Sequence, residues 1–143
     1  MKHLFLFSLA LLLLSGLASC NAQSSQGVQN SVHQDQTSPA ELSDKVAAYY
    51  FHFTSRCVTC KAIEAEAKAN LENLYGGKVP FKSINLDEAS SRMIAEMLQV
   101  SGQSLLLVKG KQIINITNEG FMYARTDPEK FRSIIKENVD RLL

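Results

Sequence analysis

The sequence predicts a single α/β domain with a central mixed sheet of about four strands flanked by three helices. Three observations predict this class. Apolar runs of strand length alternate with longer stretches in which apolar residues recur every three or four positions. Two cysteines separated by two residues stand where the first strand-like run gives way to the first helix-like stretch. The last two strand-like runs are separated by Gly110-Lys111, a pair typical of a hairpin turn.

The first four elements follow in the order strand, helix, strand, helix. The first strand covers residues 45–53, an aromatic-rich run that is apolar on both faces, as buried central strands are. The first helix runs from about residue 58 to 75 and is stopped by Gly76-Gly77. Residues 79–86 form the second strand, and the second helix opens at Asp87. This alternation predicts a central sheet with helices packed on it.

The C-terminal part of the chain adds a hairpin and a last helix. Residues 104–108 and 112–117 are the two strands of the hairpin, and residues 118–125 are less regular, with Gly120 taken as a bulge. The last helix begins at Asp127-Pro128, because proline is favoured at the first helical position. Its buried face is predicted to comprise Phe131, Ile134, Ile135, Val139 and Leu142.

The N-terminal segment has the features of an export signal. A short basic start precedes an apolar run over residues 4–17, which is too short to span a bilayer and typical of a signal peptide. The run Leu17-Ala18-Ser19-Cys20 resembles the lipobox of bacterial lipoproteins, whose cysteine is acylated and becomes the first mature residue. The resemblance implies that residues 1–19 are removed and that Cys20 anchors the protein in the bacterial cell envelope, facing the periplasm or the surface. The alternative is an ordinary signal peptide cut near Ala22.

Residues 20–44 are predicted to be the lipidated cysteine and a flexible linker. The segment is rich in Gln and Ser and has no aromatic residue, so it cannot bury enough apolar surface to fold. The folded domain is therefore predicted over residues 45–143. The formal charge of +1 for the whole chain gives no reason to expect a nucleic-acid partner.

The Cys57 and Cys60 pair carries the predicted chemistry. Cys57 stands at the start of a helix, where unpaired backbone N–H groups and the helix dipole lower a thiol pKa and favour the nucleophilic thiolate. Arg56 directly before it and Lys61 shortly after it add positive charge. Cys60 lies one turn further on, close enough to close a disulfide. We therefore predict that Cys57 attacks or carries a mixed disulfide and that Cys60 resolves it.

Residues 45–143 resemble the thioredoxin superfamily. The features that carry the resemblance are the cysteine pair, the strand before it, and the strand and turn at residues 104–110. The resemblance implies a thiol-disulfide oxidoreductase that needs no cofactor and acts on a protein dithiol, a protein disulfide or a partner reductase. Thioredoxins usually have one more strand and helix at the N-terminus, so a minimal version of the fold is expected. Residues 49–64 also look like small thioredoxin-like proteins described as subunits of nitrophenyl-compound (aromatic arsenical) nitroreductase systems, which implies electron delivery to a reductase.

The chain departs from this family at the position of a buried proton acceptor. Thioredoxins keep a carboxylate on the strand before the cysteines, and the position six residues before Cys57 is Phe51 here. His52, next to it, or Glu64, one turn after Cys60, is predicted to substitute. The alternative for His52 is a strand histidine whose hydrogen bonds are satisfied by its surroundings.

A second departure concerns the loop that carries a cis-proline in the family. This chain has no proline there, and Gln103 or Ser104 takes its place, depending on the end from which the loop is counted. The loss removes a steric block to metal, so Cu(I) or Zn(II) held by the two thiolates and His52 is one alternative function. The other is a redox-inert structural lipoprotein, although a disulfide that closes so small a ring adds little stability.

Overall fold

The structure is a computed structural model that describes residues 43–143. The predicted signal peptide, Cys20 and almost all of the predicted linker lie outside these residues. The elements, in chain order, are β1 (Ala47–His52), α2 (Val58–Tyr75), β2 (Phe81–Asn85), a 3₁₀ turn (Ala89–Ser91), α3 (Arg92–Met97), β3 (Ser104–Lys109), β4 (Gln112–Asn115), α4 (Thr117–Tyr123) and α5 (Pro128–Leu142). None of the helices in this part of the chain is long and apolar enough to cross a membrane.

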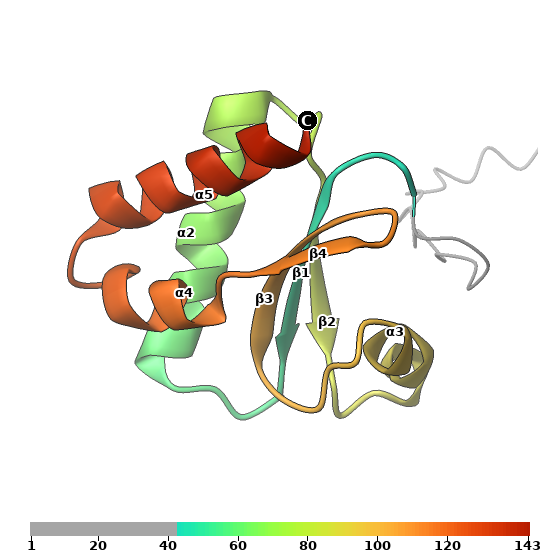
Figure 1. Ribbon diagram of the computed structural model, residues 1–143. Helices are drawn as coiled ribbons and strands as arrows, with labels where there is room; N and C mark the ends of the chain where they lie inside the picture. The colour runs from blue at the N-terminus through green and yellow to red at the C-terminus, as the bar shows by residue number, and fades with distance from the viewer. Residues whose placement is uncertain (1–42) are drawn as a thin grey trace, which may run out of the picture. The chain divides into compact units, whose positions relative to one another are not determined.

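The four strands form one mixed sheet in the order β2-β1-β3-β4 (Figure 1). Strand β1 is parallel to β2 and antiparallel to β3, and β3 is antiparallel to β4. All six residues of β1 are buried, which agrees with the prediction of a central strand that is apolar on both faces. The predicted α/β class and the central mixed sheet of four strands are confirmed.

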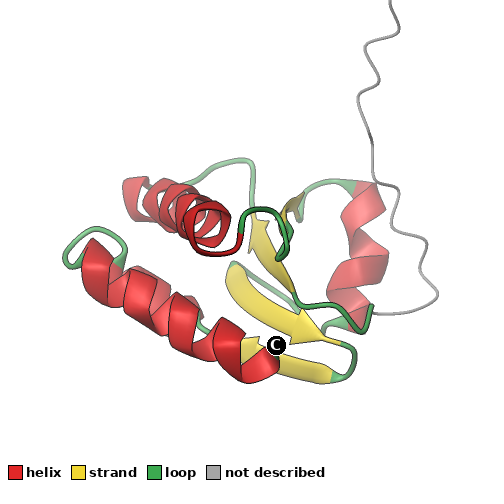
Figure 2. Cartoon of the chain, turned by 90° about the horizontal axis from the view of Figure 1, so that it is seen from above, coloured by secondary structure: helices red, strands yellow, loops and turns green. Residues whose placement is uncertain are grey.

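The helices form two layers on opposite faces of the sheet, with α2, α4 and α5 on one side and α3 on the other (Figure 1; Figure 2). Strand β1 serves both layers because its side chains alternate. Ala48 and Tyr50 belong to the core under α2 and α5, whereas Ala47, Tyr49 and Phe51 pack with α3.

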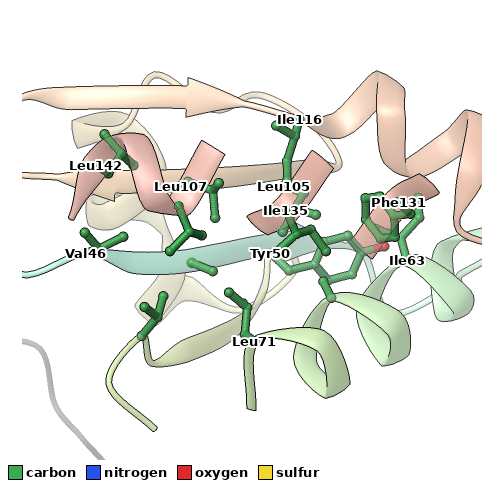
Figure 3. Packing of buried hydrophobic residues seen from close by; sticks show 14 of the residues in the cluster. Val46, Tyr50, Ile63, Leu71, Leu105, Leu107, Ile116, Phe131, Ile135 and Leu142 are labelled. Carbon is green, nitrogen blue, oxygen red and sulfur yellow. The ribbon is translucent and has the colours of Figure 1, made fainter. Parts of the chain in front are cut away.

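The larger core fills the space between β1, β3, α2 and α5. Figure 3 shows the Tyr50 ring next to Ile63 of α2 and Phe131 of α5. Of the predicted buried face of α5, four members are buried and the fifth, Ile134, is partly buried against the core. The packing therefore fixes α2, which carries the cysteines, against the central strand.

The predicted ends of the long helices are confirmed. Gly76 caps α2 in the left-handed conformation (φ 53°, ψ 49°), and its N–H donates to the Glu72 carbonyl. Asp127 caps α5 through its carboxylate, which accepts from the Lys130 N–H, and Pro128 takes the first helical position.

The expectation of an irregular segment at residues 118–125 is wrong, because residues Thr117–Tyr123 form the helix α4. The domain therefore has four helices in its described part instead of three. Gly120 is not a bulge but a contact point between helices. A Cβ at this position would lie 3.1 Å from Ile63 Cγ2, so the missing side chain lets α4 approach α2 closely.

Candidate functional site

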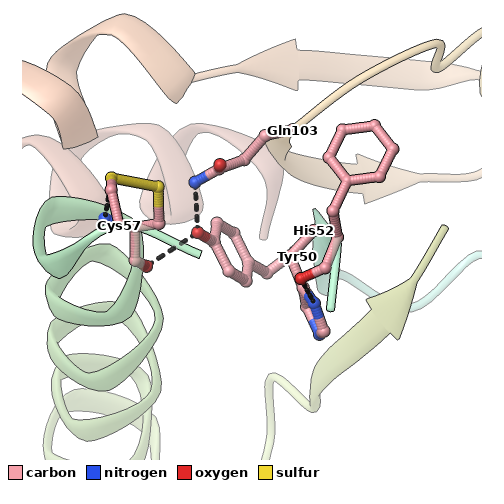
Figure 4. Close-up of a disulfide and its surroundings, with 6 residues drawn as sticks. Tyr50, His52, Cys57 and Gln103 are labelled. Carbon is pink, nitrogen blue, oxygen red and sulfur yellow. Dashed lines mark hydrogen bonds between the residues drawn. A yellow bond between two sulfur atoms is a disulfide. The ribbon is translucent and has the colours of Figure 1, made fainter. Parts of the chain in front are cut away.

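The two cysteines of the Cys-x-x-Cys motif are joined in a disulfide at the start of α2 (Figure 4). Their Cα atoms are 5.2 Å apart, which is an ordinary spacing for a disulfide. Cys57 is the N-cap of the helix, and its Sγ accepts from the Cys60 N–H at 3.2 Å. Cys57 is exposed, whereas Cys60 is only 6% exposed. A partner in solution can therefore reach Cys57 far more easily than Cys60.

The positive charge directly before the cysteines has a partner of its own. The Arg56 guanidinium donates to Glu64 Oε2, and the Ser83 hydroxyl of β2 donates to Glu64 Oε1. Burial raises the pKa of Glu64, but the hydrogen bonds from Ser83 and Arg56 and the charge of Arg56 outweigh it, so that the pKa lies below its usual value. The Lys61 side chain is exposed and makes no hydrogen bond or ion pair within residues 43–143.

The buried His52 has both ring nitrogens engaged away from the sulfurs. Its Nδ1 lies 3.0 Å from the Phe53 carbonyl oxygen, and its Nε2 lies 3.0 Å from Ser83 Oγ. In the described part of the chain, no group of three or more His, Cys, Asp or Glu side chains is arranged to hold a metal ion. The structure therefore does not bring His52 to the cysteines as the third ligand that the metal alternative requires. Within residues 43–143, neither His52 nor Glu64 makes a hydrogen bond to either sulfur.

A residue that the sequence reasoning missed, Tyr50, lies against the turn at residues 57–60 that holds the cysteines (Figure 4). Its hydroxyl donates to the Cys60 carbonyl at 2.7 Å and accepts from the Gln103 side-chain amide. Burial, reinforced by the charge of Glu64, raises the pKa of Tyr50 to about 12, so the hydroxyl stays protonated at neutral pH.

The count of six residues back from Cys57, used to find the family's proton-acceptor position, gives Phe51. This residue lies on the face of β1 that points away from the cysteines. Phe51 packs with α3, on the opposite side of the sheet from α2, whereas its neighbour Tyr50 faces α2. The alternation of strand side chains could have found this, because Ala48 and Tyr50 share the face that a helix following β1 must cover. A count taken from the family selects the wrong residue when the loop between the strand and the helix differs in length from the loop in the family.

Of the two candidates in the loop before β3, the structure brings Gln103 to the site. Its amide reaches Tyr50 from the loop, as Figure 4 shows. Ser104 is the first residue of β3 and pairs with Phe51 of β1, and its hydroxyl donates to the carbonyl of Gly102 at 3.1 Å. Because residues paired across strands lie on the same face, Ser104 is on the α3 side of the sheet.

The loop that leads to the cysteines is hydrogen-bonded to the end of β2 and to the loop after it. The Thr54 N–H donates to Asp87 Oδ2 at 2.7 Å, and the Asn85 side chain donates to Thr54 Oγ1 at 3.0 Å. The hydrogen bonds from Thr54 hold the pKa of Asp87 below its usual value. A cavity of about 350 Å³ opens beside this contact, with Phe53 and Val100 among its walls. The loop that leads to the cysteines is thus tied to the end of β2 and the loop after it.

No family model and no curated protein matches the sequence. Among solved structures, the domain is similar to thioredoxin from Fasciola hepatica, with a TM-score of 0.46 and 12% identity over 71% of this chain and 84% of that one. A second similar structure is described as a malarial protein, with a TM-score of 0.38 and 23% identity over 48% of this chain and 74% of that one. At these values the fold assignment rests on the sheet order and the connections described above.

Proposed function

We propose that the protein is a membrane-anchored thiol-disulfide oxidoreductase or electron-transfer protein whose Cys57–Cys60 pair cycles between disulfide and dithiol. The observation that carries this proposal is the unequal exposure of the two cysteines at the start of α2. Cys57 is open to a partner, and Cys60 is buried behind it. This arrangement suits an exchange in which one sulfur meets the partner and the other resolves the intermediate.

The reaction balances with a dithiol partner as the reductant. A partner thiolate attacks Cys57 Sγ, a mixed disulfide forms, and the electron pair of the Cys57–Cys60 bond leaves on Cys60, which takes up a proton. The second partner thiol loses its proton and attacks the partner sulfur of the mixed disulfide, which releases Cys57 as a thiolate. At the helix N-terminus this thiolate is stabilised by the helix dipole and by the Cys60 N–H, which already points at Sγ in the disulfide form. The partner leaves oxidised, and the reverse sequence oxidises the dithiol.

The anchoring part of the proposal rests on the lipobox resemblance around Cys20, which implies a location in a bacterial cell envelope. Replacement of Cys20 by Ser is expected to release the protein from the membrane fraction or to leave the precursor unprocessed. A Cys20→Ser protein that remains in the membrane fraction at the mature size would contradict it. The likeness of residues 49–64 to nitroreductase-system subunits supports a partner reductase as the electron acceptor.

The test of the redox proposal is a trapping experiment with two matched variants. In a Cys60→Ser protein the resolving thiol is gone, so the mixed disulfide on Cys57 should accumulate with its partner and release it on reduction. A Cys57→Ser protein should trap nothing. Equal behaviour of the two variants, together with a wild-type disulfide that does not exchange with glutathione, would leave the pair as a structural crosslink.

A further inference from the structure

A chain of two hydrogen bonds connects the loop before β3 to the turn at residues 57–60 that holds the cysteines. The Gln103 amide donates to the Tyr50 hydroxyl, and the Tyr50 hydroxyl donates to the Cys60 carbonyl at 2.7 Å. Tyr50 has no exposed surface, so water cannot replace either partner from outside. Figure 4 shows this chain beside the disulfide. Three separate segments therefore meet at one hydroxyl group.

The chemistry of the three groups fixes the direction of both bonds. A backbone carbonyl can only accept, so the single hydroxyl proton of Tyr50 is committed to Cys60. The Tyr50 oxygen can then only accept from Gln103, which must present its NH₂ group and not its carbonyl oxygen. The position requires a donor, and an acceptor of the same shape cannot take its place.

We propose that Gln103 is a positioning residue that, by donating to Tyr50, sets the redox equilibrium of the Cys57–Cys60 pair. The Cys60 carbonyl is bonded to the Cys60 Cα atom, which is part of the ring that the disulfide closes, so in the oxidised protein the ring restrains the carbonyl in its place beside the Tyr50 hydroxyl. Reduction opens that ring and frees the turn to relax. Loss of the Tyr50 donor therefore costs the disulfide form more than the dithiol form, and the equilibrium shifts toward the dithiol. This inference rests on the proposed redox function.

The decisive variant is Gln103→Glu, which keeps the shape and replaces the donor by a group that changes with pH. As a carboxylate it can only accept, so it draws the Tyr50 proton away from the Cys60 carbonyl. As a carboxylic acid it again has a proton to donate, and the native arrangement returns. An ordinary glutamate titrates near pH 4.3, and burial raises that value. The variant should therefore be altered at pH 8 and restored at pH 4.

The measurement is the equilibrium of the full-length chain with mixtures of reduced and oxidised glutathione, scored by mass spectrometry after quenching in strong acid. At each pH the equilibrium is approached from both directions until the two values agree, with a much longer incubation at pH 4, where the small thiolate fraction makes exchange slow. Cys20 is replaced by Ser in every sample, so that only the Cys57–Cys60 pair reacts. At pH 8 we expect Gln103→Glu to shift the equilibrium constant toward the dithiol by up to about tenfold, the limit reached if the whole loss of one buried hydrogen bond falls on the disulfide form. At pH 4 its ratio to the wild type should return to near one.

A double-mutant cycle with Tyr50→Phe separates the hydrogen-bond chain from the effect of the new charge. Tyr50→Phe alone should shift the equilibrium in the same direction at both pH values. In the Tyr50→Phe background, Gln103→Glu has no hydroxyl to redirect, so it should add no further shift toward the dithiol at pH 8. If the Tyr50→Phe protein does not fold, the comparison of Gln103→Glu at the two pH values still tests whether donation by Gln103 sets the redox equilibrium.

The possible failures are distinguishable. A wild-type disulfide that does not exchange with glutathione overturns the proposed function, and the inference about Gln103 falls with it. A wild type that exchanges normally, beside a Gln103→Glu variant that matches it at pH 8 or keeps the same shift at both pH values, overturns the role of Gln103 alone.

Discussion

The guanidinium of Arg56, the residue directly before Cys57, is paired with the carboxylate of Glu64. Their side chains are 22% and 25% exposed, so the pair is only partly screened by water. From the sequence alone, the Arg56 charge is expected to act on the Cys57 sulfur. The ion pair shows that Glu64 offsets part of that charge, so we expect Glu64 to influence the reactivity of Cys57.

Replacement of Glu64 by Gln should make Cys57 more acidic. The Arg56 charge is then no longer offset by Glu64, so the pKa of the Cys57 thiol in the reduced protein should fall. The measurement is the rate of alkylation by iodoacetamide as a function of pH. Glu72→Gln removes the same charge from an exposed position near the other end of α2 and serves as the control. An alkylation profile unchanged by Glu64→Gln, or a shift of equal size in the control, would show that the pair does not influence the thiol.

The same carboxylate should contribute to the acid sensitivity of the fold. Because the folded-state pKa of Glu64 is lowered, its contribution to stability is present above the unfolded-state pKa, near 4.3. That contribution is lost as the pH falls through the lower folded-state value. Urea unfolding of the oxidised protein between pH 2.5 and 7 should therefore show a smaller acid-induced loss of stability in Glu64→Gln than in the wild type. Parallel stability curves for the two proteins would contradict this.

The unequal exposure of the cysteines predicts unequal labelling. Brief alkylation of the reduced protein near neutral pH should modify Cys57 well before Cys60, because Cys57 is exposed at the helix N-terminus and Cys60 is buried. Peptide mapping by mass spectrometry gives the order. If Cys60 is modified first, the roles assigned to the two thiols are reversed.

Replacement of Gly120 by Ala should destabilise the domain, although alanine is the better helix former. The new methyl group would lie 3.1 Å from Ile63 Cγ2, and Ile63 is 1% exposed, so it has no room to move aside. We expect a loss of about 1 kcal/mol or more in the free energy of unfolding, measured by urea denaturation. Gly102→Ala is the control, since a Cβ there meets no atom within 4 Å. A Gly120→Ala protein as stable as the control would mean that α4 is free to shift.

Much of the fold could be predicted because its signals are local. The glycine at the end of α2, the Asp127-Pro128 start of α5 and the alternation of apolar runs each act within a few residues. Helix α4 was not predictable in this way, because Gly120 is unfavourable for a helix by itself. The glycine is explained by the close approach of α4 to Ile63 of α2, a contact between segments far apart in the sequence.

The candidate site likewise has residues that local sequence signals predict and residues whose role depends on the fold. The cysteine pair follows from its spacing and its position between strand and helix, and the structure joins the two residues in a disulfide. Tyr50 could not be found by counting from a family pattern, because its role depends on the face of β1 that α2 covers. The choice between Gln103 and Ser104 likewise depends on which residue begins β3, since one step along the chain reverses the face.

The complete burial of β1 limits how this domain can be re-engineered. A substitution at any residue from Ala47 to Phe51 disturbs one of the two cores, and at Tyr50 it also removes the hydrogen bond to Cys60. Arg56 and Gln103 are only partly buried and lie outside the regular elements. A variant library aimed at a stronger or weaker reductant should therefore randomise these two loop positions and leave the strand untouched.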